Sequence, residues 1–312
     1  MFMGTPQFAV PSLQALLCSQ HEVCGVVTQP DRPSGRGQRL APPPVKQLAE
    51  QHGLPVLQPE RANASVERGV ILGLAPDLIV VAAYGQILRR EYLVRPRYGA
   101  INLHASLLPR HRGSSPASAA ILAGDQVTGV TIQRMAARMD AGPILRIAET
   151  PVGDDETASE LEARLAELGA SLLPETIHEI ERGTASEQPQ DEALATTAPK
   201  LAKGDGLIDW TQPAEYLARF IRAMTDWPGA FTFWLSPERG PVRLVIRRAR
   251  ACESGAESPG TVLLVGDAEL AVATGRGALS VVELQPAGKR AMPTADFLRG
   301  HDLQPGQLLG MF

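Results

Sequence analysis

The feature that most restricts the fold is an apolar run without alternation, DLIVVAAYG at 77–85. Strands with one wet face alternate apolar and polar side chains, whereas a parallel strand covered on both faces is apolar at successive positions. Parallel neighbours must be joined by crossovers, which are usually helices. The run therefore predicts an α/β fold, with helices on both faces of a mostly parallel sheet.

Other short apolar runs with helical segments between them extend this pattern over the first half of the chain. The predicted parallel strands are VCGVVT (23–28), LPVLQP (54–59), DLIVVAAYG (77–85) and GAINLHAS (99–106). TGVTIQRM (128–135) and ILRIAETPV (144–152) predict an antiparallel pair, and 155–183 predicts a long amphipathic helix. Residues 1–188 are therefore expected to form one Rossmann-like domain with an open sheet.

The C-terminal third has a different pattern. Residues 189–206 are polar with little periodicity, which predicts a linker. A helix is expected at 215–224, and short strands separated by turns follow in GPVRLVIRRAR, GTVLLVG, ELAVATG and ALSVVELQP. This spacing predicts a small β-barrel or sandwich over 207–312.

Composition narrows the class of protein. The chain is 44% hydrophobic and 21% charged, as in an ordinary globular protein, and no apolar run approaches the ~20 residues of a membrane span. MFMGTPQF lacks a secretory pattern, so we expect a cytoplasmic protein, and we expect a monomer.

Three scattered cysteines predict no metal site. Only Met1–Met3 precede the turn at Gly4, so the first strand is either short or begins upstream.

Three polar residues predict a catalytic site. Asn102 and His104 are two positions apart on a predicted strand, so their side chains share one face. The strand ends there, where parallel sheets bind ligands. Asp140 lies in the loop MDAGPIL and could fix the tautomer of His104, while the amide could stabilise an oxyanion. This trio suits acyl transfer to an amine without a covalent nucleophile. The alternative is that Asn102 and His104 have no catalytic role and only satisfy the hydrogen bonds of a strand end.

Two apolar turns flank this trio. Leu107, Leu108 and Pro109 follow the pair directly, and a second turn follows the preceding strand at Tyr84, Gly85, Gln86, Ile87 and Leu88. Together they could form a slot for a flat heteroaromatic ring, or each could be ordinary loop packing. Neither dinucleotide nor P-loop motifs are present, so a nucleotide cofactor is not expected.

Asn102, His104 and Asp140, with SLLP at 106–109, resemble the catalytic motif of the 10-formyltetrahydrofolate-dependent formyltransferases. The resemblance implies transfer of a formyl group from 10-formyltetrahydrofolate to an amine, with those three residues catalytic. It also implies that Ser106, Leu107, Leu108, Pro109 and the turn 84–88 line the folate site. The chain departs from the family after SLLPRHRG, where SSPASAAI replaces the usual Ala-Ala-Pro.

Three further stretches resemble the branch of this family that formylates methionyl initiator tRNA. They are TQPDRPSGRGQRLAPPPVK (28–46), KLAKGDGLIDW (200–210) with IRAMTDWPGAF (221–231), and GKRAMPTADFLRG (288–300). This resemblance implies an OB-like, tRNA-binding barrel at 207–312. A sugar-nucleotide N-formyltransferase with the same folate donor is the alternative, because that branch also carries a β-rich C-terminal domain.

Basic clusters provide candidate tRNA contacts even though the net charge is −4. RPSGRGQR (32–39) carries three arginines and RLVIRRAR (243–250) carries four, each without an acid. The candidates are Arg36, Arg39, Lys203, Arg247, Arg248 and Lys289, with Arg36 favoured by the resemblance for the end of the acceptor stem. A solvated surface is the alternative. Arg110 and Arg112 could steer terminal phosphates or anchor their own loop.

Overall fold

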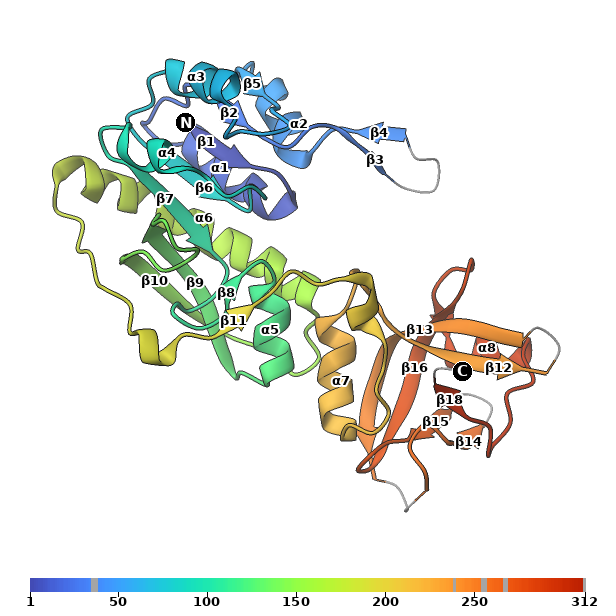
Figure 1. The fold of residues 1–312 in the computed structure, drawn as a ribbon. Coiled ribbons are helices and arrows are strands. Elements are labelled where there is room, and N and C mark those ends of the chain that lie inside the picture. Colours follow the sequence, from blue (N-terminus) through green and yellow to red (C-terminus); the bar gives the residue numbers. More distant parts are fainter. Residues whose placement is uncertain (35–38, 238–239, 254–256, 266–268, 311–312) are drawn as a thin grey trace. The chain divides into compact units, whose positions relative to one another are not determined.

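The computed structural model describes residues 1–34, 39–237, 240–253, 257–265 and 269–310, so Arg36 lies outside the described residues. The chain divides into two compact units, drawn in Figure 1. Unit 1 comprises Met1–Pro116, Gln126–Val152 and Glu160–Pro199. Unit 2 comprises Ala117–Asp125, Gly153–Ser159 and Lys200–Phe312.

Unit 1 is built on a sheet in the order β10-β9-β7-β6-β1-β2-β5. Its strands are β1 (Phe2–Gly4), β2 (Val26–Val27), β5 (Val56–Leu57), β6 (Ile79–Ala82), β7 (Ala100–His104), β9 (Val127–Arg134) and β10 (Ile144–Pro151). The strands from β5 to β7 are parallel, and β9 is antiparallel to both β7 and β10. The predicted Rossmann-like sheet and its antiparallel pair are confirmed.

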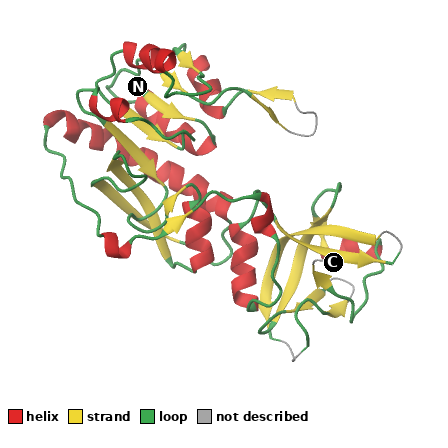
Figure 2. Ribbon diagram, viewed as in Figure 1, coloured by secondary structure: helices red, strands yellow, loops and turns green. Residues whose placement is uncertain are grey.

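Helices connect these strands, as Figure 2 shows by colour. They are η1 (Gln7–Ala9), α1 (Val10–Leu17), α2 (Pro44–Gln51), α3 (Ser65–Gly73), α4 (Arg90–Val94), α5 (Pro116–Ala123) and α6 (Ala158–Arg182). A hairpin of β3 (Arg32–Ser34) and β4 (Arg39–Ala41) extends away from the sheet (Figure 1). It includes part of the basic stretch at 32–39.

The core of unit 1 explains the apolar run at 77–85. All four residues of β6 are buried, as predicted for a strand covered on both faces. The short strand β1 lies between β2 and β6, where Phe2 pairs with Val26 and Val80. Three residues are enough for a strand here because both edges are paired and Phe2 and Met3 are fully buried.

Unit 2 is an antiparallel sheet in the order β14-β15-β16-β13-β12-β18, with β17 beside β16. The strands are β12 (Ala230–Ser236), β13 (Gly240–Cys252), β14 (Val262–Val265), β15 (Leu270–Ala273), β16 (Ala278–Pro286), β17 (Met292–Pro293) and β18 (Leu309–Gly310). Hydrogen bonds from Leu309 N to Gly260 O and from Val262 N to Gln307 O nearly close the barrel. The barrel-like expectation is confirmed.

Strand β12 was not among the strands expected from the sequence. Its alternation places Thr232, Trp234 and Ser236 on the buried side, with Trp234 in the barrel core. Short helical elements η3 (Lys203–Gly206), α7 (Ala214–Ala223) and α8 (Thr294–Arg299) complete the unit. The packing of α7 on this core explains its apolar stripe.

Within the described ranges, no helix is both long enough and apolar enough to cross a bilayer.

Helix α3 offers a test of the unit 1 core. Ile71 is 1% exposed, whereas Val66 on the same helix is 75% exposed. Ile71→Ala should lower the free energy of unfolding by about 3 kcal/mol because it removes buried methyl groups and leaves a cavity. Val66→Ala should change it by less than about 0.5 kcal/mol. Urea denaturation measures both, and equal losses would contradict the packing described.

Candidate active site

The C-terminal end of β7 carries the predicted amide and imidazole. Asn102 pairs with Gln133 of β9, and His104 pairs with Thr131 of the same strand. Residues two apart on a strand share a face, so Asn102 and His104 lie on one side of the sheet. His104 is 5% exposed and Asn102 is half-buried. The imidazole is thus largely shielded from water, and the amide is partly accessible.

Contacts of the His104 ring define its tautomer. Nε2 lies 2.9 Å from the carbonyl oxygen of His111, which can only accept a hydrogen bond, so Nε2 carries a proton. Nδ1 faces Asp140 Oδ2 at 3.7 Å, beyond hydrogen-bonding distance. In the neutral ring Nδ1 is therefore unprotonated, and it is the nitrogen that faces the Asp140 carboxylate.

Asp140 is held in place from three segments of the chain. Its Oδ2 accepts a hydrogen bond from Gly113 N (2.9 Å), and its Oδ1 accepts one from Gln133 Nε2 (3.0 Å). Gln190 Nε2 donates to the carbonyls of Asp140 and Gly142, at 2.9 and 2.7 Å. Asp140 has a φ of 49°, a left-handed conformation that an Asp tolerates better than most residues. These bonds hold its carboxylate towards His104.

Gln133 and Gln190 were not among the residues predicted from the sequence. Gln133 is 2% exposed in a strand that is buried along most of its length, and a buried amide requires partners, so its position was the available signal. Gln190 lies in the polar stretch predicted as a linker, which has no periodicity to separate one glutamine from another.

This polar stretch runs along the loop that follows His104. β11 (Thr197–Ala198) pairs in parallel with β8 (Arg112–Gly113), and His111 N donates to Thr196 Oγ1. At Gly113, φ is 127° and a Cβ would lie 2.3 Å from the carbonyl oxygen of Ala198. Only glycine fits both the backbone angle and this close approach.

Arg112 belongs to the same support. Its guanidinium donates to Gln190 Oε1 at 2.7 Å and to Glu192 Oε1 at 2.9 Å, and its side chain is 10% exposed. Arg138 also pairs with Glu192. Of the two roles considered for Arg112, its contacts correspond to anchoring the loop.

Hydrogen bonds attach the first apolar turn, residues 106–109, to β9. Thr131 Oγ1 donates to Ser106 O and accepts from Leu108 N, and Ser106 Oγ donates to Arg110 O. The Leu108–Pro109 peptide bond is cis. Ser106 and Leu108 are buried, whereas Leu107 and Pro109 are partly exposed. The surface of this turn is therefore apolar.

The second apolar turn begins beside the first, because Ala82 at the end of β6 pairs with Leu103. Tyr84 and Leu88 point into the core of unit 1, and burial raises the pKa of the Tyr84 phenol. Gln86 Oε1 accepts a hydrogen bond from Ala62 N. Gly85 and Ile87 remain exposed, with Ile87 at 71%. A ligand at this turn would contact these two residues and the backbone.

The described candidates for tRNA contact are divided between the two units. Arg39 is exposed on β4 in unit 1, while Lys203, Arg247, Arg248 and Lys289 belong to unit 2. Arg247 donates to Gln285, and Arg248 lies 3.9 Å from Glu283.

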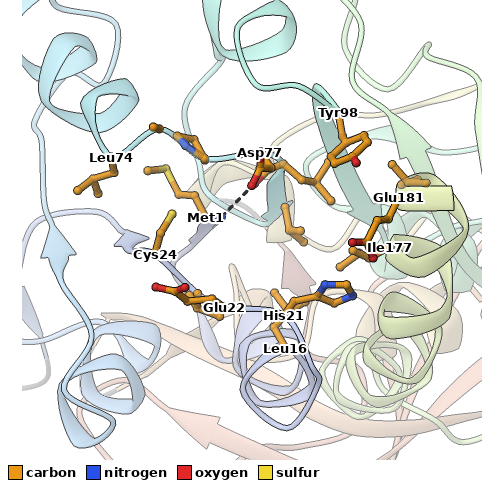
Figure 3. A pocket seen from close by; sticks show the side chains of 16 residues that line it. Met1, Leu16, His21, Glu22, Cys24, Leu74, Asp77, Tyr98, Ile177 and Glu181 are labelled. Carbon is orange, nitrogen blue, oxygen red and sulfur yellow. Dashed lines mark hydrogen bonds between the residues drawn. The ribbon is translucent and has the colours of Figure 1, made fainter. Parts of the chain in front are cut away.

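A cavity of about 400 Å³ lies at the opposite end of the unit 1 strands, beside their amino ends. Figure 3 shows His21, Glu22, Asp77, Tyr98 and Glu181 around Met1, whose amine donates to Leu78 O. Apart from Glu181, which lies near the end of α6, these residues precede the strands β1, β2, β6 and β7. Parallel sheets bind ligands beyond the carboxyl ends, so the cavity is separate from the candidate site.

An α/β domain with an Asn/His/Asp trio at a strand end, followed by a small β-barrel, defines a two-domain group-transfer enzyme. A family model described as formyl transferase matches residues 1–177, and one described as formyl transferase, C-terminal domain, matches 200–302. The chain therefore belongs to the formyltransferase family. The resemblance inferred from the sequence is confirmed.

Curated relatives place the chain in the methionyl-tRNA formyltransferase branch of this family. The chain is 48% identical over 310 residues to the methionyl-tRNA formyltransferase of Citrifermentans bemidjiense, covering 99% of this chain and 96% of the relative. It is 49% identical over 308 residues to that of Halorhodospira halophila, covering 98% and 97%.

Solved structures share the fold at lower identity. A sugar 3N-formyl transferase, WlaRD, aligns with a TM-score of 0.64 at 16% identity, covering 93% of this chain and 97% of that one. HypX from Aquifex aeolicus, crystallised with tetrahydrofolic acid, aligns with a TM-score of 0.58 at 20% identity, covering 84% and 47%.

The glycine at 142 tests the Asp140 loop. A Cβ there would lie 1.8 Å from the carbonyl oxygen of Arg134, so Gly142→Ala must displace backbone. We expect a loss of at least about 2 kcal/mol in the free energy of unfolding. Gly73→Ala is the control, because nothing lies within 4 Å of its added Cβ. Urea denaturation decides, and unchanged stability of Gly142→Ala would contradict this loop geometry.

Glu192 gives a pH test of the supporting segment. Hydrogen bonds from Arg112, then Arg138, lower the pKa of Glu192 from 4.5 to about 2. A lowered folded-state pKa contributes stability above pH 4.5 that is lost as the pH falls towards 2. The unfolding free energies of the wild type and Glu192→Gln should therefore differ by a constant amount from neutral pH down to about pH 5 and converge in acid. A difference independent of pH would contradict these ion pairs.

Proposed function

We propose that the protein transfers the formyl group of 10-formyltetrahydrofolate to the α-amino group of methionyl initiator tRNA, for translation initiation. The observation that supports this most is the trio of Asn102, His104 and Asp140 at the end of β7, in a chain 48% identical to a methionyl-tRNA formyltransferase across 99% of its length. Residues 1–188 would be the catalytic domain, 189–206 the linker, and 207–312 the OB-like tRNA-binding domain.

The chemistry follows from the contacts of the trio. The amine nitrogen forms a bond to the formyl carbon, and the bond from that carbon to N10 of the folate breaks. His104 Nδ1 accepts the proton released by the amine and returns it to the departing nitrogen. Asp140 stabilises the imidazolium meanwhile. The Asn102 amide donates a hydrogen bond to the oxygen that becomes negative in the transition state.

The folate donor would bind against the two apolar turns. Leu107, Pro109 and Ile87 expose apolar surface beside the trio, and Gly85 exposes backbone, which suits a flat heteroaromatic ring with polar edges. HypX, a structural neighbour, was crystallised with tetrahydrofolic acid, and WlaRD with 5-N-formyl-THF. We propose no metal, because the proton transfer and the oxyanion are each served by a side chain of the trio.

The tRNA would be held by basic residues outside the trio. Arg36, Arg39, Lys203, Arg247, Arg248 and Lys289 are the candidates for phosphate contacts. We further propose that the enzyme acts as a monomer in the cytoplasm, where aminoacyl-tRNA is used.

The acceptor is tested directly by incubating the protein with 10-formyltetrahydrofolate and each candidate. We expect formylmethionyl-tRNA from charged initiator tRNA, much less from charged elongator tRNA, and no product from a dTDP-linked amino sugar. Product from the sugar alone would support the sugar-nucleotide alternative, which shares the fold. The absence of formylmethionine would overturn the proposal.

The trio itself is tested by substitution. His104→Ala and Asp140→Ala should each lower kcat by about 100-fold or more with saturating tRNA, because each removes part of the proton relay. His21→Ala is the control, since His21 lines the cavity at the opposite end of the unit 1 strands and should leave kcat unchanged. Formylation rates under single-turnover conditions measure these effects. Near-normal turnover of either variant would exclude the assigned roles.

A further inference from the structure

One face of the unit 2 barrel combines arginines with aromatic rings. The strands alternate, so Trp234, Leu244 and Ile246 point into the core. The residues between them point away from this core, although Phe231 and Val245 are buried and Phe233, Arg243 and Arg247 are only partly exposed. We call this set the outer face: Phe231, Phe233, Arg243, Val245, Arg247 and Gln285, from β12, β13 and β16. Phe233 pairs with Arg243 across the strands, and Gln285 pairs with Val245.

The guanidinium of Arg243 lies over an aromatic ring. Its guanidinium carbon lies 4.0 Å from the centroid of the Phe231 ring, and Phe233 meets Phe231 edge-on at 5.8 Å. A cation over an aromatic face is attracted by the ring quadrupole. The contact covers one side of the planar guanidinium and leaves its N–H groups at the edge available to an acceptor.

Arg247 is fixed by a neighbouring amide. Its Nε and Nη2 donate to Gln285 Oε1 at 3.2 and 2.7 Å, and Gln285 Nε2 donates to Lys289 O at 2.9 Å. The amide therefore positions the guanidinium without neutralising it. A carboxylate at 285 would make the same bonds and cancel the charge.

Arg243 and Arg247 differ from the neighbouring arginines because no acidic side chain pairs with them among the described residues. Among the described residues no ion pair is recorded for Arg243 or Arg247, whereas Arg248 lies 3.9 Å from Glu283 and Arg250 3.9 Å from Asp155. Burial, followed by the charge of Arg247, lowers the pKa of Arg243. Two like charges held on half-buried side chains destabilise the isolated fold, and an external anion would relieve this repulsion.

We propose that Arg243 and Arg247 form a preorganised phosphate-binding site for the sugar–phosphate backbone of the tRNA, and that Arg248 and Arg250 lie outside it. The inference rests on the proposed function, which it refines by separating arginines that are adjacent in sequence. Guanidiniums held by neighbouring side chains suit a nucleic-acid backbone, because phosphate oxygens accept bidentate bonds. An acidic protein surface would also be attracted, but it is an outcome of the test.

The test compares arginines that carry the same charge in different surroundings. Binding of methionyl-tRNA to the full-length protein is measured between 50 and 300 mM KCl for the wild type, R243Q/R247Q and R248Q. Each lost phosphate contact lowers the slope of log K against log[salt] by about 0.9. We expect a loss of about 2 in the slope for the double variant, with at least about tenfold weaker binding, and a slope within about 0.3 of wild type for R248Q.

Two further measurements separate this inference from folding and from the proposed function. The double variant should keep a melting temperature within about 3 °C of the wild type, since no buried ion pair is lost, and the wild type should form formylmethionyl-tRNA. If R243Q/R247Q does not fold, R247Q carries the same comparison, because the Phe231 contact is untouched. Equal slopes for the double variant and R248Q, or a wild-type slope in the double variant, would overturn the inference.

Failure of the proposed function has a different signature. A wild-type protein that forms no formylmethionyl-tRNA contradicts that function, whatever the slopes. A wild type that formylates normally while the double variant keeps its salt dependence contradicts only the phosphate site. If R243Q/R247Q binds tRNA as the wild type does but no longer binds an acidic peptide that the wild type binds, the outer face belongs to a protein partner instead.

Discussion

The candidate site depends on the fixed position of one carboxylate. Asp140 receives hydrogen bonds from the backbone of Gly113 and from Gln133, and Gln190 holds the loop that carries it. With both oxygens occupied by donors, the carboxylate faces His104 without bonding to it. The unprotonated Nδ1 of His104 is the ring nitrogen on that side, as the proposed proton transfer requires.

This arrangement joins residues that are far apart in the sequence. The end of β7 supplies Asn102 and His104, and β9 supplies Thr131 and Gln133. Gln190 donates hydrogen bonds to the backbone of the Asp140 loop. Thr131 also staples the first apolar turn, so the surface beside the trio and the trio itself share one support. A change in this support should therefore alter both the proposed proton relay and the proposed folate surface.

Much of the fold could be predicted because it follows from local patterns. The consecutive apolar residues of β6 required a covered parallel strand, and the two-residue spacing of Asn102 and His104 placed them on one face. Gln190 and Arg112 could not be assigned, because their roles come from tertiary contacts that leave no periodic signal. The same holds for Tyr84, whose side chain turns into the core while its neighbours Gly85 and Ile87 stay exposed. The four arginines of 243–250 looked equivalent in sequence, and only their partners separate them.

The central claim is that the His111 carbonyl and the Asp140 carboxylate leave His104 with its proton on Nε2 and a basic Nδ1. Nitrogen NMR of the protein labelled with ¹⁵N-histidine, recorded at a pH where the ring is neutral, measures this tautomer directly. The His104 resonances are assigned by their loss in His104→Gln. The account predicts a protonated Nε2 and an unprotonated Nδ1. A neutral ring protonated on Nδ1 would contradict it, because the nitrogen facing Asp140 could then accept no proton.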